Sequence, residues 1–178
     1  RKPYQVGSYR TDFVFDLEDI PVVLLTAFGK ALKAVSKGKL EVDWDLLEEE
    51  RFNCGEKFMM AGKCMVFDED AYKKLSKLKD PKLIKAYGRK NISNFVPRIW
   101  DTVSIYWVLI GNYLKFSQNP KMAKILKKTG SDILVEASPY DRIWGIGLGC
   151  NHPNISNPNM WKGTNKLGEV LMQIREFI

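Results

Sequence analysis

Apolar residues recur at helical spacing along most of the chain. After Pro21, a residue suited to the start of a helix, they fall three or four residues apart as Val22, Leu25, Phe28, Leu32 and Val35. Gly38 follows them, so the pattern predicts an amphipathic helix that this glycine ends. The longest such stretch runs from Pro97 to about Phe116, and it predicts the central core helix.

Capping residues mark further helix boundaries. Predicted helix starts lie at Asp43, Asp68, Asp80-Pro81, Asn119-Pro120 and Thr164, and Gly55 starts or interrupts the helix that carries Glu56 and Lys63. Gly88 is predicted to close the helix after Asp80, and Thr129-Gly130 to close the one after Asn119. Strands are predicted around Phe13 and Phe15 and at residues 132–136. We therefore expect a mainly α fold, one compact helical domain over residues 1–178 with a few short strands and a long functional loop.

That loop runs from Ser138 to about Gly163 and is rich in glycine, proline and asparagine. A loop of this length inside a compact domain is more often functional than idle. Its glycines let backbone approach a ligand closely, and Trp144 offers a flat stacking face, although a tryptophan fills a core about as often. The alternating glycines are no dinucleotide fingerprint, because their spacing is wrong and no helix opens directly after them.

Composition is that of an ordinary globular protein, with 45% hydrophobic and 28% charged residues. No stretch approaches the length of a membrane span. The three cysteines form no framework spacing, which indicates free thiols and a reducing, cytoplasmic location. Together with the lone His152 they lack the close pairs typical of zinc sites, so we expect no metal and no cofactor.

The formal net charge is +7, which favours an anionic partner. Much of the excess lies in two groups, one formed by Lys73, Lys74, Lys77, Lys79, Lys82, Lys85, Arg89 and Lys90, the other by Lys121, Lys124, Lys127 and Lys128. Such groups are usually solvated helix faces, but they also suit a phosphate-bearing ligand or nucleic acid.

Glu56 and Lys63 are seven residues apart in a predicted helix. Seven residues return almost to the same helix face, about 10 Å along the axis. This separation is too long for a simple ion pair but suits two long side chains that bracket one small ligand. On spacing alone, a solvated charged face is the commoner explanation.

A series of motifs shifts that balance. In order, the chain carries Glu56 with Lys63, Tyr87-Gly88-Arg89, Trp100-Asp101-Thr102-Val103, Leu114 to Pro120, Leu134-Val135-Glu136-Ala137, Asp141 to Gly147 and Trp161 to Gly168. From about Gly55 to its end the chain thereby resembles the NADAR family, named for an association with NAD and ADP-ribose. It departs from the family pattern at Lys57, where a histidine often follows the glutamate, and residues 1–50 are divergent or rearranged.

The resemblance implies a mainly α-helical N-glycosidase, which hydrolyses the bond between a ribose carbon and a nitrogen. Family substrates include phosphoribosylated riboflavin intermediates and ADP-ribose attached to guanine, as in DNA. The implied catalytic pair is Glu56 and Lys63. The expected substrate-binding residues are Arg89, Trp100, Glu136, Asp141, Trp144, Gly145, Gly147, Trp161 and Asn165.

N-glycoside cleavage builds positive charge at the anomeric carbon and needs a protonated leaving base. Our hypothesis is that Lys63 attacks the ribose as a nucleophile and forms a Schiff base, while Glu56 moves protons and stabilises the sugar cation. Two other interpretations stay open at this point. One is a non-catalytic module that binds ADP-ribose or NAD, and the other is a plain nucleic-acid-binding protein.

Overall fold

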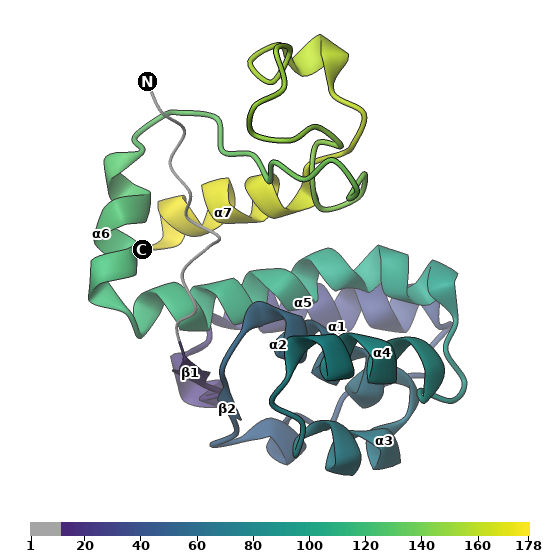
Figure 1. Ribbon diagram of the computed structural model, residues 1–178. Helices are drawn as coiled ribbons and strands as arrows, with labels where there is room; N and C mark the ends of the chain where they lie inside the picture. The colour runs from purple at the N-terminus through teal and green to yellow at the C-terminus, as the bar shows by residue number, and fades with distance from the viewer. Residues whose placement is uncertain (1–11) are drawn as a thin grey trace. The chain divides into compact units, whose positions relative to one another are not determined.

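The computed structural model describes residues 12–178 and is mainly α-helical, which confirms the predicted fold class (Figure 1). Within those residues, seven α-helices and one two-stranded sheet are joined by loops and short 3-10 turns. The chain divides into two compact units, residues 12–119 and residues 120–178, which we call the helical core and the loop unit. One domain over residues 1–178 stays a prediction, and residues 1–11 lie outside the described part.

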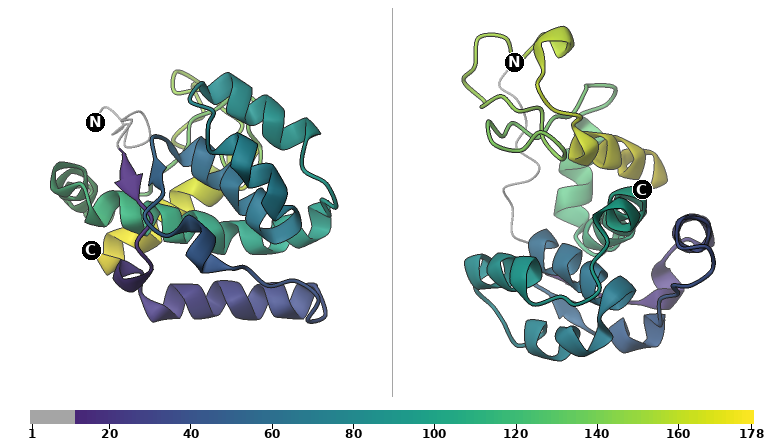
Figure 2. Two further views of the ribbon diagram at one scale, coloured as in Figure 1. Left: turned by 90° about the horizontal axis from the view of Figure 1, so that it is seen from below. Right: turned by 90° about the vertical axis from the view of Figure 1, so that its right-hand side faces the viewer.

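The helical core contains β1 (Phe13–Val14), α1 (Val22–Val35), β2 (Arg51–Phe52), α2 (Gly55–Phe67), α3 (Glu69–Leu75), α4 (Pro81–Lys90) and α5 (Pro97–Ser117). β1 pairs antiparallel with β2, and Phe13 stands opposite Phe52. α2 packs against α3, α4 and α5. Figure 2 shows α1 lying alongside α5, the longest helix. Among residues 12–178 no helix is long and apolar enough to cross a membrane.

Trp107 of α5 is the centre of an aromatic cluster in the helical core. Its ring is fully buried and stacks on Phe58, with centroids 4.8 Å apart, and on Trp44, with centroids 5.5 Å apart. Its indole N–H donates to the Phe58 carbonyl oxygen at 2.8 Å, so the one polar group of this buried ring is satisfied. The cluster therefore ties α2 to α5 by stacking and by a hydrogen bond.

The loop unit contains α6 (Pro120–Lys128), a long segment without helix or strand, a 3-10 turn at Pro158–Met160, and α7 (Lys166–Phe177). α6 and α7 contact one another. The prediction of a long loop after Ser138 is thus confirmed. Gly130 lies just after α6, where the end of this helix was predicted. Its φ of 56° is a left-handed conformation that favours glycine.

Three predicted helix caps are confirmed by hydrogen bonds. Asp43, Asp68 and Asp80 each accept a bond from a backbone N–H two or three residues later. The predicted end at Gly88 is wrong, because α4 continues to Lys90. Gly88 is instead a packing residue: a Cβ there would lie 2.0 Å from the sulfur of Met60 on α2. This glycine lets α4 approach α2 closely.

The predicted strand at residues 132–136 is wrong, since this segment pairs with no strand in the described chain. The side chain of Asn165 takes the place of a partner strand. Its oxygen accepts from the Glu136 N–H at 3.0 Å, and its amide nitrogen donates to the Leu134 carbonyl at 2.9 Å. Thr164 is also not the cap of α7; Asn165 occupies that position, with a left-handed φ of 54°.

Gly62 should tolerate no side chain, because a Cβ there would lie 2.6 Å from the Trp107 ring and 2.7 Å from the Trp100 ring. We expect Gly62→Ala to lower the free energy of unfolding by about 1–3 kcal/mol through overpacking. Gly29 is the matched control, because it is exposed in α1 with no atom within 4 Å of its would-be Cβ. Gly29→Ala should raise the same free energy by up to about 1 kcal/mol, as measured by urea unfolding. Equal effects of both changes would contradict this packing.

Candidate active site

Lys63 lies in the middle of α2, and Glu56 lies in its first turn. A carboxylate in the first turn is favoured by the helix dipole, which gives Glu56 a stable place at this end. Among residues 12–178, Glu56 and Lys63 form no ion pair with one another. Both side chains are partly buried. The carboxylate and the amine lie on the same helix without contacting one another, as their spacing of seven residues predicts.

An aromatic ring lies under the Lys63 amine. The Lys63 Nζ atom is 5.1 Å from the centroid of Phe95, in the segment between α4 and α5. Phe95 is itself held edge-on against Phe67 at the end of α2, with centroids 5.1 Å apart. A cation–π contact of this length favours one position of a long, flexible side chain. Phe95 therefore favours a position of the Lys63 amine beside its ring.

Burial lowers the pKa of Lys63, and this desolvation is the largest influence on it. The Glu56 and Asp101 carboxylates act in the opposite direction, whereas the Arg89 guanidinium adds to the lowering. The net direction is downward, so Lys63 holds more of its neutral, nucleophilic form near neutral pH than an exposed lysine does. A partly buried amine of lowered pKa is a form of lysine suited to covalent chemistry.

Arg89 and Asp101 are exposed residues of α4 and α5 whose charges act on Lys63. The close packing of Gly88 against Met60 sets where Arg89 stands relative to α2. Asp101 is not among the predicted site residues, although it belongs to the motif Trp100-Asp101-Thr102-Val103. Neither Asp101 nor Phe95 could be found without knowing which helices pack together.

Trp100 has only 6% of its surface exposed, and the edge of its ring lies against Gly62. The structure thus gives Trp100 a packing role against Gly62, the residue before Lys63. Its predicted contact with substrate stays a prediction.

In the loop unit, two predicted residues form a pair of carboxylates. Asp141 accepts hydrogen bonds from the N–H groups of Ile143 and Trp144, at 3.0 and 2.8 Å, and so fixes a tight turn. Glu136 is partly buried, and this burial, followed by the Asp141 charge, raises its pKa. A carboxyl group with a raised pKa keeps a proton at higher pH, which suits a hydrogen-bond donor to a sugar oxygen.

The loop glycines are required by chain-to-chain packing. A Cβ on Gly145 would lie 2.9 Å from the Glu136 carbonyl oxygen, and one on Gly147 would lie 2.9 Å from Lys162. The Gly147 N–H donates to the Asp141 carbonyl at 3.2 Å, so this amide is already used inside the loop. Gly147 also has a φ of 70°, which favours glycine. Packing thus accounts for both glycines, and their contact with a ligand stays a prediction.

The two loop tryptophans differ in their surroundings. Trp144 is partly exposed and lies beneath the Lys166 amine, 5.8 Å from its ring centroid, so the alternative that it fills the core is not what the structure shows. Trp161 donates its indole N–H to the Ile155 carbonyl at 2.8 Å and closes the segment between them. Trp144 therefore keeps an accessible aromatic surface for stacking.

Asn165 is buried, and both polar atoms of its side chain are bonded to residues 134 and 136. Asn165 holds the two ends of the long loop together, and this positioning role was missed in the sequence. Its predicted contact with a phosphate stays a prediction.

The eleven predicted site residues thus fall into two sets. Glu56, Lys63, Arg89 and Trp100 belong to the helical core, while Glu136, Asp141, Trp144, Gly145, Gly147, Trp161 and Asn165 belong to the loop unit. Each set is brought together within its own unit, and their participation in one common site stays a prediction.

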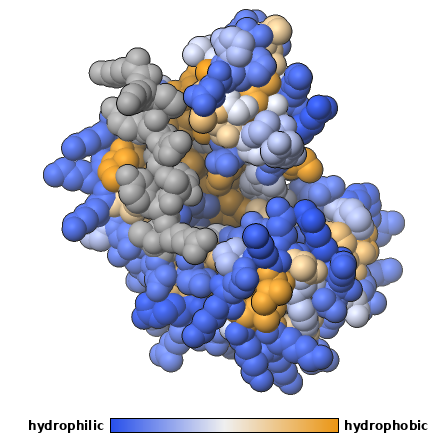
Figure 3. Space-filling model, viewed as in Figure 1, coloured by the Kyte–Doolittle hydropathy of each residue, from blue (hydrophilic) through white to orange (hydrophobic). Residues whose placement is uncertain are grey.

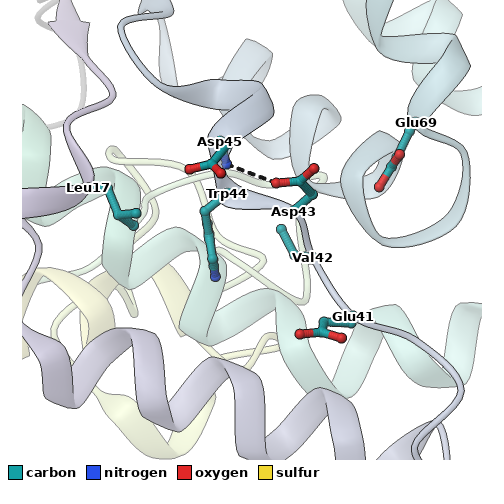
Figure 4. Close-up of a pocket in the computed structure, with 7 residues that line it drawn as sticks. All are labelled: Leu17, Glu41, Val42, Asp43, Trp44, Asp45 and Glu69. Carbon is teal, nitrogen blue, oxygen red and sulfur yellow. Dashed lines mark hydrogen bonds between the residues drawn. The ribbon is translucent and has the colours of Figure 1, made fainter.

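A separate pocket of about 410 Å³ opens elsewhere on the helical core (Figure 4). Its lining residues are Leu17, Glu41, Val42, Asp43, Trp44, Asp45 and Glu69, none of which was predicted as a site residue. Four carboxylates around one pocket repel a phosphate, so this pocket does not suit the expected substrates. No cluster of three metal-ligating side chains exists among residues 12–178.

The family comparison matches the NADAR domain over residues 15–178. The chain belongs to the NADAR domain family. The match begins upstream of Gly55, so it includes most of the segment that the sequence alone left without a resemblance. The match also covers both units of the structure.

This NADAR domain is similar in sequence to several proteins and similar in fold to a solved structure. It is 47% identical over 122 residues to N-glycosidase R617 of Acanthamoeba polyphaga mimivirus, covering 68% of this chain and 71% of that protein. It is 38% identical over 128 residues to Protein irg-1 of Caenorhabditis elegans, covering 71% of this chain and 60% of that protein. The solution structure of Escherichia coli YbiA is similar in fold, with a TM-score of 0.58 and 24% identity over 74% of this chain and 70% of that one.

The charges around Lys63 predict how its pKa responds to substitution. Arg89→Gln should raise the pKa of Lys63, because it removes a like charge, and Asp101→Asn should lower it further. The pH dependence of Lys63 acylation, followed by peptide mass spectrometry, measures both shifts. Lys30→Gln on the exposed face of α1 is the control and should leave the midpoint unchanged. Shifts of the opposite sign would contradict the described surroundings.

Asn165→Asp should destabilise the NADAR fold by about 1–3 kcal/mol, because a carboxylate would face the Leu134 carbonyl and leave it without a donor. Asn157→Asp is the matched control. Its side-chain oxygen accepts from Asn159 N–H at an exposed turn, and aspartate preserves that bond. The control should change the free energy of unfolding by less than about 0.5 kcal/mol. Similar losses in both variants would mean that Asn165 does not join the loop ends.

Proposed function

We propose that this NADAR domain is an N-glycosidase that hydrolyses a ribose–nitrogen bond, with Lys63 as nucleophile and Glu56 as proton carrier. One observation carries the proposal: Lys63 is a partly buried amine of lowered pKa, free of an ion pair with Glu56, on the same helix as that carboxylate. The relative named N-glycosidase R617 supports the same class of reaction.

In the first step, the Lys63 Nζ atom attacks the anomeric carbon as the bond from that carbon to the base nitrogen breaks. The bonding electrons leave with the base, which takes up a proton that the Glu56 carboxylate relays from the attacking Lys63 nitrogen. The sugar remains attached through a carbon–nitrogen bond, and opening of its ring gives a Schiff base.

In the second step, water adds to the same carbon and expels the Lys63 amine. The Glu56 carboxylate accepts the proton that the water loses and passes it to the departing nitrogen, so that Lys63 leaves as the neutral amine and Glu56 is again a carboxylate. Positive charge on the sugar is greatest when neither nitrogen is fully bonded to carbon, and a nearby carboxylate stabilises this state most. One water is consumed, and no redox change occurs.

The charges around the site favour a phosphate-bearing substrate. Arg89 is exposed beside Lys63 and offers a guanidinium group suited to bidentate contact with phosphate. We propose as substrates ADP-ribose attached to guanine, in DNA or nucleotides, or a phosphoribosylated riboflavin intermediate. In the loop unit, the proposed substrate contacts are Trp144 for stacking and Glu136 and Asp141 for sugar hydroxyls.

The test is release of free ADP-ribose from an ADP-ribosylated guanine nucleotide, followed by chromatography. Lys63→Met, which keeps the length of the side chain without the amine, should reduce turnover on the order of 10³-fold or more. Glu56→Gln should reduce it roughly 10²- to 10⁴-fold. Lys30→Met on α1 is the control and should keep wild-type turnover.

Other outcomes of this assay are also decisive. In one, the wild type releases nothing from this nucleotide or from a phosphoribosylated pyrimidine and yet binds ADP-ribose tightly. That result would reject the glycosidase and favour a non-catalytic binding module. Full turnover by Lys63→Met would exclude the covalent route.

A further inference from the structure

The turn that carries Phe95, between α4 and α5, is anchored to the junction of α2 and α3. The Asp68 carboxylate accepts from the Ala71 N–H with one oxygen, at 3.3 Å, and from the Ser93 N–H with the other, at 3.0 Å. Asn94 follows with a φ of 61°, a left-handed conformation that asparagine tolerates. Phe95 is the next residue, so these contacts hold its backbone in place.

The Phe95 ring stays exposed in spite of this anchoring. It packs edge-on against Phe67, yet 36% of its surface is exposed. A phenylalanine is usually buried, because burial removes its apolar surface from water. Figure 3 shows that the surface over α3 and α4 is mostly hydrophilic, with only small hydrophobic patches. An anchored, exposed ring 5.1 Å from the Lys63 amine thus offers a flat apolar face where the proposed reaction takes place.

Asp101 of α5 lies near the same amine. Trp100, the residue before it, packs against Gly62, the residue before Lys63, so the close approach of α2 and α5 brings the two charged residues together. Their charges interact. Asp101 is exposed, and among residues 12–178 its carboxylate forms no hydrogen bond or ion pair. Both of its oxygens are therefore available to a ligand.

A carboxylate beside the proposed nucleophile suits the leaving base better than the phosphates of a substrate. It repels a phosphate, whereas its two oxygens can accept two parallel hydrogen bonds from neighbouring N–H groups. Guanine carries such a pair, a ring N–H next to an amino group, and an aminopyrimidinone carries the same pair. Adenine instead has an amino group next to a ring acceptor, and the nicotinamide ring has no N–H. An aromatic side chain can stack on any of these bases, so the carboxylate is the group that discriminates among them.

We infer that Phe95 and Asp101 bind the leaving base of the substrate. The Phe95 ring stacks on the face of the base, and the Asp101 carboxylate accepts hydrogen bonds from the ring N–H and the amino group beside it. This inference rests on the proposed N-glycosidase activity and names the residues that select its base. They select a base with adjacent ring N–H and amino groups, such as guanine, over adenine or nicotinamide.

The test is binding of guanosine and of inosine, which keeps the ring N–H but lacks the amino group, followed by NMR titration. The wild type should bind guanosine about tenfold more tightly, because inosine makes one hydrogen bond fewer to a charged acceptor. In Asp101→Asn the ratio of the two affinities should fall close to 1. Both ligands meet the same Lys63 amine in this variant, so its changed pKa does not affect the ratio. Asp45→Asn, at an exposed position in the turn Trp44–Leu47, is the charge-matched control and should keep the wild-type ratio.

Phe95→Leu removes the aromatic face and should weaken the binding of both nucleosides about tenfold without changing their ratio. Phe95→Tyr keeps that face and should retain wild-type affinity, and circular dichroism checks that each variant is folded. Equal binding of guanosine and inosine by the wild type, or a preference that survives in Asp101→Asn, would overturn the role of Asp101. Wild-type affinity in Phe95→Leu would overturn the role of Phe95 and leave its ring only a contact of the Lys63 amine.

Turnover separates this inference from the proposed function. Phe95→Leu should lower kcat/KM for the ADP-ribosylated guanine nucleotide about tenfold, chiefly by raising KM, because stacking holds the base before and during the reaction. Absence of turnover in the wild type, with the guanosine preference lost in Asp101→Asn but not in Asp45→Asn, would refute the glycosidase and keep the base-binding residues. Normal turnover with wild-type kcat/KM in both Phe95→Leu and Asp101→Asn would refute the base-binding residues and keep the glycosidase.

Discussion

The contact of Gly62 with Trp100 and Trp107 is the constraint on which the candidate active site depends. A Cβ at Gly62 would collide with both rings, so α2 lies as close to α5 as two backbones and two indoles allow. The Trp107 N–H bond to the Phe58 carbonyl fixes the same helix one turn earlier. Lys63 directly follows Gly62, so the backbone that carries its side chain is held by the packed interior, while the Phe95 ring favours one position of its amine. Such rigidity is what an oriented nucleophile requires.

Electrostatics then gives this rigid amine its chemical character. Burial opposes its charge, Arg89 adds to that effect, and Glu56 and Asp101 partly offset it. A carboxylate in direct contact would hold the amine protonated, whereas Glu56, two helix turns away, raises the pKa of Lys63 less than burial lowers it. In the proposed mechanism this carboxylate is left to stabilise the sugar cation. The same Arg89 is exposed and carries a guanidinium group suited to bidentate contact with phosphate. The proposed nucleophile, proton carrier and phosphate-binding group thus belong to helices of one packed unit.

The sequence predicted most helix starts and the separated Glu56 and Lys63 on one helix, and its other predictions failed for identifiable physical reasons. Aspartate caps and apolar spacing gave correct helix starts, because these signals are local. Gly88 was misassigned because its function is contact with Met60, a residue distant in sequence. The segment 132–136 has strand-like composition, yet the Asn165 side chain takes its hydrogen bonds. Phe95 and Asp101 act on Lys63 only through the packing of three helices, which no motif records.

The central claim is that Lys63 holds the sugar covalently during turnover. The most direct measurement is borohydride reduction of the protein during turnover of an ADP-ribosylated guanine nucleotide, followed by peptide mapping. Reduction converts a Schiff base to a stable secondary amine, so the account predicts a sugar-derived mass increase on the peptide that contains Lys63, and none on Lys57 or Lys115. Continued release of ADP-ribose with the Lys63 peptide unmodified would contradict it, and Glu56 would then activate water directly.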